Sequence, residues 1–350
     1  MSRHTAARAP LALVAAAVML LALAAPAFAQ MPVTRLDPGV TTVDMAVSWS
    51  QASFADDSAP TVIIARDDDF ADALASGAIQ GALEAPLLLT DSTILSPATA
   101  VEIARLGSSE AIVLGGSDAV GPTVIAAIEA LGLDTEVVAG PTRIETAVAV
   151  VNRFFPNAVE VVLARAFGTD SDPTQAFADS LTAAPYSAAA NTPVLLTDSD
   201  VLSTSTADAL GSLNVQRVLV VGGTAAVAAS VADAAAAAID SDEPGVDTNV
   251  DRVGGQTRFD TAALLNAELR YPTGADAPRI ILTEGQDSNA WASGFPAGAQ
   301  AGNGAATVLS NGENLPPETL AYITGANVPL ICGPGVSPAA CDAAAEAINS

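Results

Sequence analysis

The segment Gly140-Pro-Thr-Arg-Ile-Glu-Thr-Ala147 decides how this chain is organised, because it occurs more than once. It recurs as Gly255-Gln-Thr-Arg-Phe-Asp-Thr-Ala262, and a degraded copy stands at Gly39-Val-Thr-Thr-Val-Asp-Met-Ala46. The three copies begin 101 and 115 residues apart. Self-similarity of this kind indicates tandem structural repeats.

Two more anchors follow each copy of this segment in the same order. One is an apolar run led in two copies by proline, and the other is an apolar run that ends in glycine. The copies of the first anchor are Pro86-Leu-Leu-Leu-Thr-Asp91, Pro193-Val-Leu-Leu-Thr-Asp198 and Ala306-Thr-Val-Leu-Ser-Asn311. The copies of the second are Ile112-Val-Leu-Gly-Gly116, Leu219-Val-Val-Gly-Gly223 and Ile331-Cys-Gly-Pro334. These anchors predict repeat 1 at residues 30–138, repeat 2 at 139–253 and repeat 3 at 254–350.

Residues 1–29 have the features of a secretory signal peptide. A positive segment with Arg3 and Arg8 precedes an apolar stretch over residues 11–25, and Ala27-Phe-Ala29 forms a cleavage site. The apolar stretch, about 15 residues, is shorter than the roughly 20 that a membrane-spanning helix needs. We therefore expect an exported chain with no membrane insertion after the signal is removed.

Charge and residue content exclude several kinds of function. The 13 basic residues are all Arg and oppose 39 acidic residues. Without the signal, 11 arginines remain and the formal charge is −28, which disfavours nucleic acid as a partner. The one histidine, His4, lies in the signal, so Ser-His-Asp catalysis and His-bearing zinc sites are excluded. Lys is absent, which excludes Schiff-base chemistry and phosphate-binding P-loops. We expect neither a cofactor nor a metal.

Short apolar runs alternate with longer Ala-rich segments within each repeat. In repeat 1 this pattern predicts strands at 61–65, 87–89 and 111–114 and helices at 70–83, 97–106 and 120–131. The strands are continuous apolar runs, as expected for parallel sheets covered on both faces. The fold class is therefore α/β, with a small doubly wound layer in each repeat.

Two cysteines, Cys332 and Cys341, lie nine residues apart in a chain that we expect to be exported. A disulfide is the natural interpretation in an oxidising compartment. It would join the end of the last strand to the last helix. The alternative is a pair of buried reduced thiols.

The repeated segment contains residues that helix capping explains and others that it does not. Thr142 and Glu145 fit a capping box, in which the hydroxyl caps the N3 amide and the acid reaches back to the cap. Capping does not explain four residues, namely Arg143, Arg258, Thr146 and Thr261. Arginine at a helix N-terminus opposes the helix dipole. It either builds an anion site with the free amides or pairs with a buried acid of a neighbouring repeat.

Asp72 and Asp179 occupy the same place in Phe70-Ala-Asp-Ala-Leu74 and Phe177-Ala-Asp-Ser-Leu181. We predict that each lies in the first turn of a helix, where an acid favours the helix dipole. A second hypothesis pairs these acids with Arg143 or Arg258.

Four glycines, Gly115, Gly116, Gly222 and Gly223, follow apolar strands. An α/β sheet usually binds its ligand at this end of its strands. A tight strand-to-helix turn would also account for them.

Together the anchors resemble the cell wall-binding repeat 2 family of Gram-positive surface proteins. Near matches to the family's pattern are residues 140–147, 70–74, 86–90 and 113–116, and the resemblance covers essentially all of 31–350. It implies three tandem Rossmann- or toprim-like units with parallel sheets, packed with pseudo-threefold symmetry. Such units bind an anionic glycopolymer of the cell wall non-covalently in the clefts between them.

Two repeats depart from the family pattern. Repeat 1 has Thr42 in place of the arginine and Met45 in place of the second threonine. Repeat 3 has Asn289 where the aspartate is expected, and Gly333-Pro334 replaces the glycine pair. Repeat 2 and its borders are therefore the best candidate sites.

We accordingly predict a non-catalytic wall-binding module at the cell surface. The predicted polymer-binding residues are Arg143, Thr146, Arg258, Thr261, Asp72, Asp179, Gly115, Gly116, Gly222 and Gly223. The alternatives are a wall hydrolase that uses a carboxylate pair and a soluble-ligand binder that uses the glycines at the sheet ends.

Overall fold

Each copy of the repeated segment starts a helix in the computed structural model, which describes residues 30–169, 171–239 and 249–350. The three helices are α1 (Thr42–Ser53), α5 (Arg143–Phe154) and α9 (Arg258–Glu268). The signal peptide predicted at residues 1–29 lies outside the described residues. The remainder, from Met31 to Ser350, forms one unit.

A threonine caps each of these helices, but the three caps differ. Thr41 forms the complete capping box with Asp44. Thr257 accepts a hydrogen bond from the amide of Asp260 at 3.1 Å. Thr142 accepts from the amide two residues on, at 3.2 Å, so the box predicted for α5 is wrong in this detail. In all three copies the cap satisfies an amide that the helix itself leaves without a partner.

The strands form three sheets of four, and every strand pair is parallel. The sheet orders are β3-β2-β4-β5, β7-β6-β8-β9 and β1-β12-β10-β11. The strands are β1 (Val33–Arg35), β2 (Thr61–Arg66), β3 (Leu87–Thr90), β4 (Glu110–Leu114), β5 (Asp134–Val138), β6 (Glu160–Arg165), β7 (Val194–Thr197), β8 (Arg217–Val221), β9 (Asn249–Val253), β10 (Ile280–Glu284), β11 (Ala306–Ser310) and β12 (Leu330–Cys332). The predicted α/β class with three like units is confirmed.

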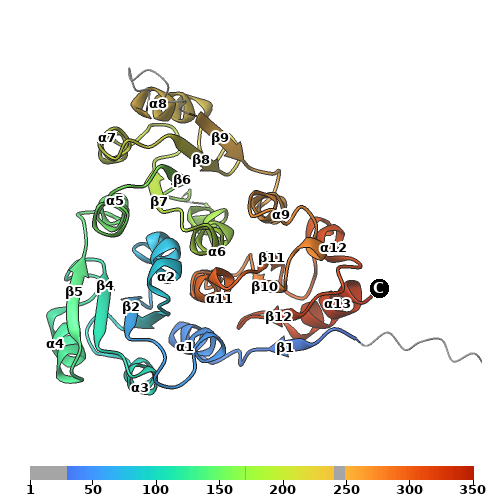
Figure 1. Ribbon diagram of the computed structural model, residues 1–350, viewed down its shortest axis with the longest axis horizontal. Coiled ribbons are helices and arrows are strands. Elements are labelled where there is room, and N and C mark those ends of the chain that lie inside the picture. The colour runs from blue at the N-terminus through green and yellow to red at the C-terminus, as the bar shows by residue number, and fades with distance from the viewer. Residues whose placement is uncertain (1–29, 170, 240–248) are drawn as a thin grey trace, which may run out of the picture. The chain divides into compact units, whose positions relative to one another are not determined.

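Helices cover the sheets and fill the space between them (Figure 1). Besides the three capped helices they are α2 (Gly77–Leu83), α3 (Pro97–Leu106), α4 (Pro122–Ala130), α6 (Ser180–Ala190), α7 (Thr204–Ser212), α8 (Ala229–Ile239), α10 (Trp291–Gly294), α11 (Gly298–Gly302), α12 (Pro317–Ile323) and α13 (Pro338–Ile348), with 3₁₀ turns η1 (Ala73–Ala75), η2 (Pro173–Ala176) and η3 (Gly274–Asp276). The helix predicted over 70–83 is wrong in its first half. That segment forms η1 and only then α2.

Three helices, α2, α6 and α11, lie side by side at the centre of the three sheets (Figure 1). Glycine allows this approach, since a Cβ at Gly77 would overlap the carbonyl oxygen of Ala184, and one at Gly81 that of Ala188. The centre of the unit is therefore packed backbone against backbone, as its Ala-rich and Gly-rich composition allows.

The third sheet takes its edge strand from the beginning of the chain. Val33 of β1 pairs with Leu330 of β12, and the Met31 amide donates to Asn349 Oδ1 at 2.7 Å. The first two sheets receive this strand from the segment just before the next capped helix. The third sheet receives it as β1, from the segment just before the first capped helix, so β1 closes the ring of repeats.

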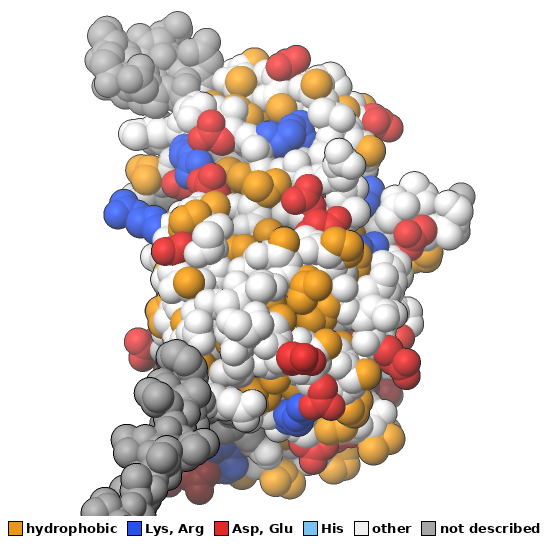
Figure 2. Space-filling model, turned by 90° about the vertical axis from the view of Figure 1, so that its right-hand side faces the viewer, with side chains coloured by type: hydrophobic (Ala, Val, Ile, Leu, Met, Phe, Trp, Pro, Cys, Tyr) orange, Lys and Arg blue, Asp and Glu red, His pale blue; other side chains and the backbone are white. Residues whose placement is uncertain are grey.

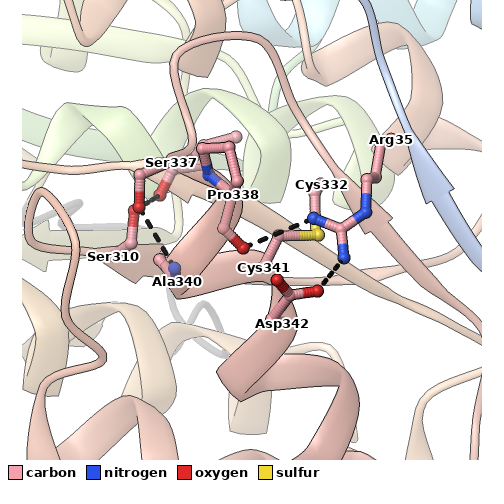
Figure 3. The surroundings of a disulfide bond; sticks show 9 residues. Arg35, Ser310, Cys332, Ser337, Pro338, Ala340, Cys341 and Asp342 are labelled. Atoms are coloured by element: carbon pink, nitrogen blue, oxygen red, sulfur yellow. Dashed lines mark hydrogen bonds and ion pairs between the residues drawn. A yellow bond between two sulfur atoms is a disulfide. The ribbon is translucent and has the colours of Figure 1, made fainter.

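The predicted disulfide is present and holds this closure together (Figure 3). Cys332 at the end of β12 is bonded to Cys341 in α13, with 6.0 Å between the Cα atoms. Beside it, Arg35 of β1 donates to the carboxylate of Asp342. Strand β1 is thereby tied to the same helix that the disulfide clips to β12.

None of the helices within the described ranges combines the length and the apolar character that a membrane crossing requires. On the face that Figure 2 shows, basic side chains are scattered among acidic and apolar ones and form no continuous area. A broad basic surface of the kind that binds nucleic acid is therefore not seen there.

Candidate functional site

The border between repeats 2 and 3 brings the N-terminus of α9 against the carboxyl ends of β6 and β8. Arg258, the first residue of α9, donates through Nη1 to the Gly285 carbonyl at 2.7 Å. Its Nη2 donates to Thr174 Oγ1 at 3.2 Å. One guanidinium thus connects the two repeats across their border.

Asp179 lies in the same border, buried at the start of α6. It is the N-cap residue of α6, at the start of a helix, but its side chain makes no capping hydrogen bond. Thr261, whose hydroxyl donates to the Thr257 carbonyl at 3.1 Å, lies close enough to this carboxylate to lower its pKa. Gly222 has a φ of +104°, and a Cβ there would lie 2.5 Å from Asp179 Oδ2. Glycine at this position both permits the turn and makes room for the carboxylate.

Burial affects how readily the Asp179 carboxylate takes up a proton. It raises the pKa of Asp179, and the nearby Thr261 hydroxyl and the charges of Arg165 and Arg258 oppose the rise only in part. Burial also lowers the pKa of Arg258, which nearby Asp172 and Asp179 counteract. Charged groups in this border are therefore poorly solvated, which strengthens their interaction with a bound ion.

These groups line a pocket of about 400 Å³. Its wall includes two arginines and two aspartates together with the backbone of Gly223 and Gly255. The lining residues are Arg165, Asp172, Gln175, Ala178, Asp179, Gly223, Ala225, Ala226, Gly255, Gln256, Thr257, Arg258, Phe259 and Gln286. The predicted residues Arg258, Asp179 and Gly223 thus meet in one cavity, with Gly222 directly behind the carboxylate.

Sequence reasoning missed Arg165, the last residue of β6. Its Nη1 donates to Gln175 Oε1 at 3.3 Å, and the residue is 9% exposed. A signal was available, since the equivalent strand of repeat 1 also ends in an arginine, Arg66. A cation that closes an apolar strand lies at the carboxyl end of the sheet, where ligands bind.

The border between repeats 1 and 2 has the same plan. Arg143 donates to the Ala166 carbonyl at 3.1 Å, and its guanidinium lies 5.0 Å from the ring centre of Phe70 and 5.1 Å from that of Phe167. It also forms a loose ion pair with Asp69 at 3.7 Å. This arginine is stacked between two aromatic rings and faces an acid.

Asp72 repeats the environment of Asp179. Burial raises its pKa, and a hydrogen bond from Thr146 lowers it. Gly115, at φ +99°, stands where a Cβ would overlap the Asp72 carboxylate. Gly116 faces open space.

The hypothesis that Asp72 and Asp179 pair directly with Arg143 and Arg258 is wrong. No such ion pair occurs among the described residues, and the second threonine of the next repeat lies close enough to each aspartate to lower its pKa. The other explanation for these arginines is an ion pair with a buried acid of a neighbouring repeat. Among the described residues, Arg143 makes a loose contact of this kind with Asp69.

The third border, between repeats 3 and 1, keeps the capping threonine and its acid but differs at the positions of Arg258, Thr261, Asp179 and Arg165. Its pocket of about 520 Å³ contains Glu284, Asp287 and Glu313 and has no basic residue in its lining. Met45 and Asn289 line it where the other borders have threonine and aspartate. This border is acidic where the other two carry arginine.

Glu284 ends β10, as Arg165 ends β6. The strand registers show that these two positions are equivalent. Arg165 of β6 pairs with Thr197 at the end of β7, and Glu284 of β10 pairs with Ser310 at the end of β11. The Glu284 carboxylate accepts from the amides of Gln286 and Asp287, both at 2.6 Å, and from Gly312 at 3.0 Å. Its role in this border is to hold two loops.

Comparison with known proteins gives the relatives of this arrangement. The model of a family described as Cell wall binding domain 2 (CWB2) matches residues 36–125 and 138–232, together more than half of the chain. N-acetylmuramoyl-L-alanine amidase LytC of Bacillus subtilis (strain 168) is 25% identical over 260 residues, which are 73% of this chain and 46% of the amidase. The amidase enhancer of the same organism is 24% identical over 225 residues, 64% of this chain and 28% of that protein.

Two solved structures have the same fold. Cwp8 from Clostridium difficile gives a TM-score of 0.76 at 22% identity, covering 91% of this chain and 52% of that one. Cwp6 from Clostridium difficile gives 0.77 at 16% identity, covering 92% and 48%. The chain spans about half the length, or less, of the relatives and structures that it matches here.

Proposed function

Because the chain belongs to the cell wall binding domain 2 family, we propose that it is a non-catalytic module that attaches non-covalently to an anionic polymer of the cell wall. The polymer lies in the two borders of repeat 2. The observation that carries this proposal is the placement of Arg143 and Arg258. Each starts a helix, donates to the carbonyl that follows a strand of its own repeat, and contacts a side chain of the preceding repeat across the border.

Local charge reconciles an anionic ligand with an acidic protein. The chain without its signal has 11 arginines against 39 acids, so its overall field repels a polyanion. At a distance of one Debye length, about 8 Å in physiological salt, that field is largely screened. Contacts in a partly buried border are screened much less, and hydrogen bonds from arginine to an oxyanion are among the strongest.

Catalysis is not part of this proposal. The match to the amidase covers 46% of that protein, and a zinc amidase needs histidine, whereas His4 is the only one here. Within the described ranges, no group of His, Cys, Asp and Glu side chains is placed to hold a metal ion. These observations support a binding role at the wall of an exported protein.

Sedimentation with purified cell walls tests the proposal. The wild-type chain should co-sediment, and Arg143→Ala and Arg258→Ala should each weaken binding about tenfold, because each removes a charge-assisted hydrogen bond. Arg153→Ala is the matched control. Arg153 is an exposed arginine of α5 whose side chain pairs with Glu136. Wild-type chain that stays in the supernatant would refute the proposal.

A further inference from the structure

We propose that the border between repeats 2 and 3 is the primary site, where Arg165 and Arg258 together hold one oxyanion, a phosphate or a carboxylate group of the polymer. This inference rests on the proposed function and assigns it to one pocket, with Arg165 as an added binding residue. Within the described residues, neither of the other two borders has two arginines without a carboxylate partner.

The bonding of Arg165 is the first reason. The residue is 9% exposed, and its Nη1 reaches only Gln175, at 3.3 Å. Its Nε is buried and meets no hydrogen-bond partner in the part of the chain that the structure describes. Buried donors of a charged group without an acceptor are costly, so they are rare unless a ligand supplies the acceptor.

The charges of the pocket are the second reason. Arg165 and Arg258 line the same pocket, and burial together with the nearby charge of Arg258 lowers the pKa of Arg165. Among the described residues, no carboxylate forms an ion pair with either arginine, although the charges of Asp172 and Asp179 act to raise the pKa of both. Asp172 accepts from the Thr174 amide and hydroxyl at 3.1 and 2.6 Å. An oxyanion between the two guanidinium groups would relieve their repulsion.

The corresponding arginines at the border of repeats 1 and 2 are already engaged. Arg66 forms a bidentate pair with Asp68, with Nε to Oδ1 at 2.5 Å and Nη2 to Oδ2 at 2.8 Å. Arg143 is stacked on Phe70 and Phe167 and faces Asp69. An anion there must compete with carboxylates that are part of the chain.

The border of repeats 3 and 1 has no arginine at either position. Thr42 stands at the position of Arg258, and Glu284 at that of Arg165. With Glu284, Asp287 and Glu313 in its wall, this pocket repels an oxyanion. Among the described residues, the border between repeats 2 and 3 is therefore the one with two arginines that form no ion pair with a carboxylate, although each donates a hydrogen bond to a neutral group.

Nuclear magnetic resonance of the arginine Nε–H groups tests this assignment directly. The full chain without its signal is titrated with inorganic phosphate and, separately, with acetate, and Arg165→Lys identifies the Arg165 resonance. We expect the Arg165 Nε–H signal to shift with saturation for at least one of the two anions, and the preferred anion indicates the class of polymer group. A shift that does not saturate with either anion would overturn the assignment.

Matched variants separate this inference from the proposed function. Arg165→Gln should weaken sedimentation with cell walls about tenfold or more, and Arg66→Gln, the same position at the other border, by less than about twofold. Arg165→Lys should fall between Arg165→Gln and wild type, and thermal unfolding checks that each variant folds. If wild type binds walls and both glutamine variants bind equally well, the pocket assignment fails while the proposed function stands. If wild type does not bind, the proposed function itself fails.

Discussion

The border of repeats 2 and 3 and the border of repeats 3 and 1 share one backbone plan and differ in their charged residues. In both, a threonine-capped helix meets the ends of two parallel strands and encloses a pocket. Four residues of the first border have counterparts of different chemistry in the second. The pairs are Arg258 and Thr42, Thr261 and Met45, Asp179 and Asn289, and Arg165 and Glu284.

This comparison separates residues that fold the unit from residues that serve a site. The capping threonine and the acid three residues later, Thr257 with Asp260 and Thr41 with Asp44, occur in both borders. The arginines, the aspartate and the second threonine are absent together from the border of repeats 3 and 1. Residues that are absent as a set without loss of the backbone plan are not needed for folding, which favours a role in binding.

The largest effect should come from giving the first border the residues of the second. Arg165→Glu combined with Arg258→Thr should lower wall affinity about a hundredfold or more, because each charged hydrogen bond contributes about 1.5–3 kcal/mol. Binding isotherms with purified walls measure the change. Thr42→Ala at the other border is the control and should leave affinity unchanged. Equal losses in both variants would mean that the borders do not differ in function.

At the ends of strands β6 and β10, the effects of substitution on stability should rank in the opposite order to the effects on binding. Glu284→Ala should cost about 3 kcal/mol, because three backbone amides lose a buried carboxylate acceptor. Arg165→Gln should cost less than about 1 kcal/mol, since Arg165 makes a single long hydrogen bond. Midpoints of urea unfolding measure both. An Arg165 variant less stable than the Glu284 variant would contradict a ligand-binding role for Arg165.

The glycine behind Asp179 should be required for both folding and binding. Gly222→Ala should cost about 1–3 kcal/mol, because its φ is +104° and a Cβ would lie 2.5 Å from the carboxylate. Gly116→Ala is the control, as nothing lies within 4 Å of its Cβ position. Thermal unfolding of both variants tests the difference, and equal midpoints would argue against the close contact.

The smallest effect concerns pH. The pKa of Asp179 is raised by burial, so the carboxylate takes up a proton as pH falls through that raised value. Its negative charge beside Arg165 and Arg258 is then lost, and an anion should bind a few-fold more tightly at the lower pH. Asp179→Asn, which copies Asn289, should remove this dependence in the phosphate titration.

The same raised pKa affects stability with a definite sign. The folded state holds the Asp179 proton more tightly than the unfolded state, so this group stabilises the fold at pH below its ordinary value of 3.8. That contribution is lost as pH rises through the raised pKa. Asp179→Asn should therefore flatten the acidic side of the stability profile, measured by urea unfolding at several pH values. Asp72→Asn, at the border of repeats 1 and 2, is the control for the binding prediction above. It should leave the pH dependence of phosphate binding unchanged.

The sequence by itself determined the features that depend on local chemistry. Ordered anchors predicted three like units, apolar runs predicted buried parallel strands, and Thr41, Thr142 and Thr257 marked the helix starts. Spacing and compartment predicted the bond between Cys332 and Cys341. These succeed because capping, turn formation and strand burial depend on residues close together in the chain.

Tertiary structure alone decided which groups share a pocket. Arg165 and Arg258 are 93 positions apart in the chain, and only the packing of α9 against the end of β6 brings them together. Strand β1 is a second example. Its place beside β12 results from the closure of the ring of repeats, and no local sequence pattern predicts it. Local patterns specify the backbone of each unit, whereas the border between two units depends on how their helices pack at the centre. The charged pairs of the candidate site exist only after that packing is complete.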